Sequence, residues 1–82
     1  MKSRVDKREV DMHRFLIVIE KAGGNYSAYS PDLPGCVATG KTRDQVARNM
    51  HAAIELHVRG LAEDHLPIPK GNASAEYIAV VA

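Results

Sequence analysis

The sequence predicts an α+β domain, with three short strands, one helix and a final strand in the order β-β-β-α-β. A β-branched run that stops at Gly-Gly-Asn indicates a strand followed by a hairpin turn. A Pro-Gly corner separates two further short strands, and a later segment has apolar residues at helical spacing. With 82 residues, the chain is long enough for one modest hydrophobic core.

The first three strands are expected at residues 13–20, 26–30 and 36–40. The first is rich in β-branched and aromatic residues, which favour strands. Between the second and third, Pro31 to Gly35 form a stiff corner, because proline fixes φ and glycine permits positive φ. We therefore assign structural roles to Pro31 and Gly35.

The helix has the clearest signals in the chain. Thr42 and Gln45 fit a capping box, in which the Thr42 hydroxyl accepts from the Gln45 amide and the Gln45 side chain reaches back. Asn49 lies within one turn of the apolar stripe and is expected to hydrogen-bond the backbone of the Pro31–Gly35 corner. The stripe that predicts the helix consists of Val46, Met50, Ala53, Ile54, His57, Val58 and Leu61. Residues 75–82 are expected to form the final strand.

We expect a four-stranded sheet in the order 3-2-1-4, with the helix packed on one face. The first strand is apolar on both sides, since Phe15, Ile17 and Ile19 alternate with Leu16 and Val18. One helix covers only one face, and a strand that is apolar on both sides is normally covered on both. We expect the uncovered face to be closed by another copy, by a different protein, or by residues 1–12. We interpret residues 1–12 as a flexible N-terminal arm and residues 13–82 as the domain.

Charge and cysteine content narrow the classes of function. Eleven basic and 10 acidic residues give a formal net charge of +1, which argues against a protein that binds nucleic acid by neutralising phosphates. Cys36 is the only cysteine, so an internal disulfide is excluded and a reducing compartment is expected. The N-terminal residues lack the apolar segment of a signal peptide, and no apolar run is long enough to cross a bilayer. We therefore expect a cytoplasmic protein with no membrane association.

Catalytic and metal-binding patterns are weak. A metal-dependent nuclease needs several converging carboxylates, whereas Glu20, Asp32 and Asp44 are scattered over a strand end, the corner and the first helical turn. Cys36 and the histidines also lack the spacing of a zinc site on one helix. We interpret Cys36 as a small buried hydrophobe and expect neither an enzyme nor a cofactor.

A set of linked motifs resembles the HicB family of antitoxin-type proteins. It begins with the first strand and continues through Pro-Asp-Leu-Pro-Gly-Cys at 31–36, Gly-Lys-Thr-Arg-Asp-Gln at 40–45, and Asn-Met-His-Ala-Ala-Ile at 49–54. Leu66-Pro-Ile-Pro69 also fits the way in which family members leave the helix. The resemblance covers roughly residues 13–69.

The resemblance implies a partial, degenerate ribonuclease-H-like unit without nuclease activity. It implies binding to a small mRNA-cleaving HicA-type toxin and, for short members, self-association as a dimer or tetramer. A C-terminal DNA-binding domain is not expected here, and neither is direct DNA binding. The alternative is an orphan self-assembling structural or ligand-binding domain without a toxin partner. The residues that we expect to contact a partner or a second copy are Leu16, Val18, Tyr29, Asp32, Leu33, Pro34 and Tyr77.

Overall fold

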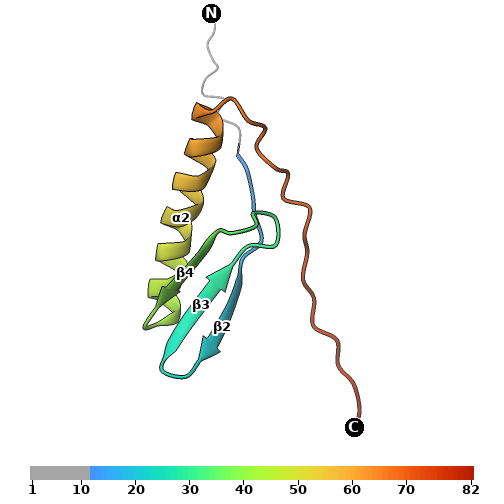
Figure 1. Ribbon diagram of the computed structural model, residues 1–82. Helices are drawn as coiled ribbons and strands as arrows, with labels where there is room; N and C mark the ends of the chain where they lie inside the picture. The colour runs from blue at the N-terminus through green and yellow to red at the C-terminus, as the bar shows by residue number, and fades with distance from the viewer. Residues whose placement is uncertain (1–11) are drawn as a thin grey trace, which may run out of the picture.

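The computed structural model describes residues 12–82, which form an α+β fold with a three-stranded antiparallel sheet and one helix. The strands are β2 (Val18–Ala22), β3 (Asn25–Tyr29) and β4 (Val37–Gly40), in the spatial order β2-β3-β4. Helix α2 (Arg43–Glu63) lies along one face of this sheet (Figure 1). The expected N-terminal arm falls on residues 1–11, outside the described part, and on Met12, which is exposed.

The pairing register explains why the first strand begins later than expected. Val18 pairs with Tyr29, the last residue of β3, and the hairpin closes at Ala22 and Asn25. Beyond Tyr29 the chain turns at the proline corner, so the residues before Val18 have no β3 residue opposite them. They therefore continue as an extended segment along α2 without strand pairing to β3.

Helix α2 begins as the capping box predicts. Thr42 has extended backbone angles (φ −130°, ψ 163°), and its Oγ1 accepts a hydrogen bond of 3.0 Å from the Gln45 amide. The Gln45 Oε1 accepts from the Lys41 amide at 2.7 Å, one residue earlier than in the usual capping box. At the other end His65 adopts a left-handed φ of 56°, which turns the chain out of the helix.

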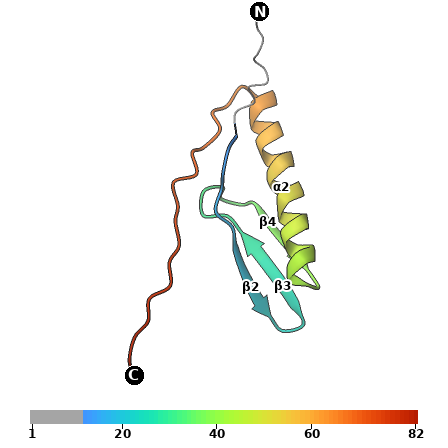
Figure 2. The same ribbon diagram turned by 180° about the vertical axis from the view of Figure 1, so that it is seen from behind.

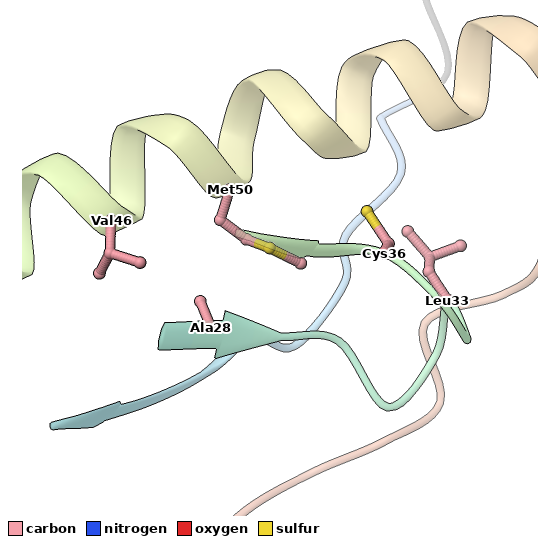
Figure 3. Close-up of a cluster of buried hydrophobic side chains, with 5 residues drawn as sticks. All are labelled: Ala28, Leu33, Cys36, Val46 and Met50. Carbon is pink, nitrogen blue, oxygen red and sulfur yellow. The ribbon is translucent and has the colours of Figure 1, made fainter. Parts of the chain in front are cut away.

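The core lies between the sheet and the first half of α2 (Figure 3). Val46 and Met50 point from the helix toward Ala28 on β3, and Leu33 and Cys36 close the cluster from the corner. Gly40 permits this close packing, since a Cβ on Gly40 would lie 2.7 Å from the Val46 backbone nitrogen. The helix and β4 therefore pack almost backbone to backbone where α2 begins.

The expected fourth strand is absent from the described structure. Residues 64–82 contain no helix or strand, and residues 75–82 run as an exposed extended segment on the side of β2 away from the helix (Figures 1 and 2). The order 3-2-1-4 is thus corrected to three strands. Strand propensity favours an extended backbone, but a strand also requires a neighbour with which to pair. Among residues 12–82 this segment pairs with no strand.

Candidate protein-binding surface

The sheet face opposite α2 carries an apolar row that crosses all three strands. Ala28 and Ala38 are paired and pack toward the helix, so their neighbours in sequence point to the opposite face. On that opposite face Val18 pairs with Tyr29, and Tyr29 pairs with Val37. The exposed fraction is 42% for Tyr29 and 64% for Val37, which leaves a substantial apolar surface open to solvent.

The next row on the same face is polar. Glu20 pairs with Ser27, and Ser27 pairs with Thr39. The open face is therefore apolar toward the proline corner and polar toward the hairpin. Leu16 lies two residues before Val18 and extends the apolar end, where it is half-buried. We call Leu16, Val18, Tyr29 and Val37 the open-face row.

The proline corner borders the apolar end of this face. Two backbone hydrogen bonds fix its shape. The Leu33 amide donates to the Ser30 carbonyl oxygen (3.2 Å), and the Cys36 amide donates to the Leu33 carbonyl oxygen (3.1 Å). Gly35 has a φ of +86°, as expected for the turn. Pro31 and Pro34 are exposed, so Pro34 stays available to a partner.

Two corner residues that we expected to contact a partner have other roles. Leu33 is 0% exposed and belongs to the core, which corrects its expected place on the contact surface. Asp32 is half-buried, and its carboxylate accepts from the backbone amides of Leu16 (3.4 Å) and Ala73 (3.0 Å). Asp32 therefore ties the segments before the sheet and after the helix together, a role that its position in a turn motif did not reveal.

Asn49 also differs from its expected role. Its side-chain nitrogen donates to the Thr39 backbone oxygen at 2.8 Å, so it ties the helix to β4 and not to the corner. The reason is geometric, because β4 runs directly beneath this turn of α2. Tyr77 lies on the exposed C-terminal segment, where it lines an open groove together with Val18 of the open-face row.

The structure also has a concave surface that the sequence did not predict. An open cavity of about 690 Å³ lies between the extended residues before β2 and the part of α2 that runs from Ala47 to Arg59. Phe15, Ile17, Ile54 and Val58 line it, with His51 and Arg59 among its polar groups. One sequence feature could have indicated this cavity: the predicted helix is longer than the three short strands, so part of it extends beyond the sheet.

The carboxylates and histidines are not assembled for catalysis in the described residues. Glu20 is on β2, Asp32 binds two amides, and Asp44 lies in the first turn of α2. His51 lies 3.8 Å from Glu55, one helical turn away. Within residues 12–82 no cluster of three or more His, Cys, Asp or Glu side chains is arranged to hold a metal ion.

Cys36 is buried, and this burial raises the pKa of its thiol above the ordinary value. A thiol with a raised pKa is a poor nucleophile at neutral pH. Across residues 12–82, no helix combines the length and the apolar character that a membrane span requires.

Comparison with known proteins identifies the family. The family model described as "HicB_like antitoxin of bacterial toxin-antitoxin system" matches residues 15–81. The chain belongs to this HicB-like antitoxin family. The match includes the open-face row, the corner, the helix and most of the C-terminal segment, and it confirms the resemblance seen in the motifs.

Three relatives are similar over much of the chain. A UPF0150 protein of Synechocystis is 30% identical over 71 residues, covering 85% of this chain and 90% of the relative. A UPF0150 protein of Thermoplasma acidophilum is 33% identical over 71% of this chain and 84% of its own length. One from Helicobacter pylori is 45% identical over 60% of this chain and 68% of its own length. No solved structure gives a significant match. Membership of this family supports an antitoxin role in general and suggests a non-enzymatic protein.

Proposed function

We propose that this protein is a non-catalytic binding module that binds a small mRNA-cleaving toxin of the HicA type and masks its active surface. The observation that carries the proposal is the open-face row, in a chain of the HicB-like antitoxin family. A soluble domain rarely leaves such a row uncovered unless another molecule covers it.

The surface has the composition of a protein interface. Tyr29 stands at its centre with Val18 and Val37 on either side, and tyrosine is enriched among the residues that dominate binding energy. The polar row at the hairpin end and the exposed Pro34 at the corner would form its rim. Masking by direct contact requires no catalytic group in the antitoxin.

The net charge of +1 bears on the mechanism of masking. A protein that protected mRNA by coating it would need a basic surface. This chain is nearly neutral, so protection by binding the toxin fits better than protection by binding the RNA. Encounter with a basic toxin would then depend more on apolar contact than on electrostatic steering.

The test is an RNA-cleavage assay with a purified toxin of the HicA type. We expect one equivalent of this protein to suppress cleavage by that toxin, and we expect the two proteins to co-purify. The control is an unrelated ribonuclease, whose activity should be unchanged; its inhibition would indicate RNA coating. A toxin that cleaves normally and does not bind at micromolar concentration would contradict the proposal.

The second candidate is a self-assembling domain without a toxin partner. It is favoured by the exposed apolar C-terminal segment, which needs a neighbour whether or not a toxin exists. Self-association and toxin binding are compatible, because they need different parts of the surface.

A further inference from the structure

The C-terminal segment, residues 75–82, is extended, apolar and uncovered. The exposed fractions are 104% for Tyr77, 78% for Ile78, 81% for Val80 and 104% for Val81. β-branched and aromatic residues dominate the segment, and such residues favour strands. An isolated exposed strand of this kind tends to pair with any available sheet edge.

The sheet has such an edge in β2. Among residues 12–82, β2 pairs only with β3, so the backbone groups on its outer side have no strand beside them. An open groove of about 470 Å³ lies between the start of β2 and the segment, lined by Ile17, Val18, Ile19, Arg43, Ala75, Glu76 and Tyr77. The segment and the edge are therefore close enough to share a groove but are not joined as strands.

The base of the segment is fixed to the body of the protein. Ala73 donates its amide to Asp32, and Gly71 lies so close to the Arg14 carbonyl that no side chain would fit at residue 71. After this anchor the chain runs past β2 as an extended, exposed segment (Figures 1 and 2). We call residues 75–82 the C-terminal arm: its base is anchored, and its apolar end pairs with no strand among residues 12–82.

We propose that residues 75–82 of one copy add as a strand to the outer edge of β2 in a second copy, reciprocally. Each chain offers both an unpaired edge and an unpaired strand, so two copies satisfy both needs in one closed, symmetric dimer. Backbone hydrogen bonds would give the affinity, as in other cases of strand addition. Each sheet would then have four strands, the fourth supplied by the other copy.

The first test is the mass in solution with no toxin present, so its outcome is independent of the proposed function. We expect about twice the 9.0 kDa of one chain, stable to dilution. An even-numbered larger assembly would support the proposal if the arm variants below disrupt it. A strictly monomeric chain at all concentrations would overturn it.

Proline substitutions on the arm distinguish strand pairing from simple apolar contact. Successive backbone N–H groups of a strand point to opposite sides, so only one of two neighbours donates to β2. Of Ala79→Pro and Val80→Pro, one should raise the dimer dissociation constant at least about tenfold, and the other should change it far less. Val80→Ala controls for loss of the valine side chain.

The matched surface control is Leu56→Lys, because Leu56 is an exposed leucine (67%) on α2, away from the arm. Ile78→Lys should weaken the dimer at least about tenfold, and Leu56→Lys should leave it intact. A dimer that both proline variants leave unchanged would overturn the proposal. So would proline variants that lower thermal stability without changing the mass, since these would indicate pairing of the arm with its own β2.

Discussion

Replacing Leu33 by alanine should destabilise the protein strongly, because Leu33 anchors the proline corner in the core. Its side chain is 0% exposed and packs in the cluster with Cys36, Val46 and Met50. Large-to-small substitutions at such sites cost about 2–5 kcal/mol of unfolding free energy. A domain of 82 residues has about 4–12 kcal/mol in total, so the variant loses a large part of its stability.

The assay is urea unfolding followed by circular dichroism, at equal protomer concentration for all proteins. With a denaturant slope of about 1 kcal/mol per molar urea, we expect the midpoint to fall by about 2 M or more. Leu56→Ala is the matched control, since this leucine is 67% exposed and should shift the unfolding free energy by no more than about 0.5 kcal/mol. Coincident midpoints for the two variants would refute the assignment of Leu33 to the core.

Three further predictions concern the helix, its packing and the cysteine. Gly40→Ala should lower the free energy of unfolding by about 1–3 kcal/mol, because the new Cβ would meet the Val46 backbone. Gly60→Ala, at a helix position with open space around it, should raise this free energy by about 0.5–1 kcal/mol. Equal shifts for the two variants in thermal unfolding would contradict the close packing at Gly40. Thr42→Ala should cost about 1 kcal/mol in chemical unfolding through loss of the N-cap, and no loss would argue against the capping bond. Burial raises the pKa of the Cys36 thiol, so the folded state keeps the thiol proton at a pH where the unfolded state has lost it. The free energy of unfolding should therefore fall as pH rises above about 8.5, and this fall should be smaller in Cys36→Ala.

Local sequence signals predicted those parts of the fold that depend on neighbouring residues. The capping pair Thr42 and Gln45, the positive φ at Gly35 and the helical stripe through Val46 and Met50 all follow from short-range chemistry. The division of the first strand into two faces was also predictable, because alternation sets which residues point together. Val37 could have been found in the same way, since it lies between the buried Cys36 and the half-buried Ala38.

Long-range contacts were harder to predict. Asp32 accepts from amides 16 and 41 residues away, and no pattern in the sequence marks such partners. Asn49 was expected at the corner because it is polar and lies within one turn of the apolar stripe, but only the packing of α2 on β4 decides which carbonyl it meets. The composition of residues 75–82 indicates a strand, whereas the choice of a pairing partner depends on the whole assembly.

The affinity of the toxin-type partner for two variants of one strand tests the central claim most directly. Val37 and Thr39 lie two residues apart on β4 and on the same face, Val37 in the apolar row and Thr39 in the polar row. Measured by calorimetry, Val37→Lys should weaken binding by tenfold or more, on the order of 1.4 kcal/mol, while Thr39→Lys should leave it nearly unchanged. Equal affinities for the two variants and the native protein would contradict the assignment of binding to the open-face row.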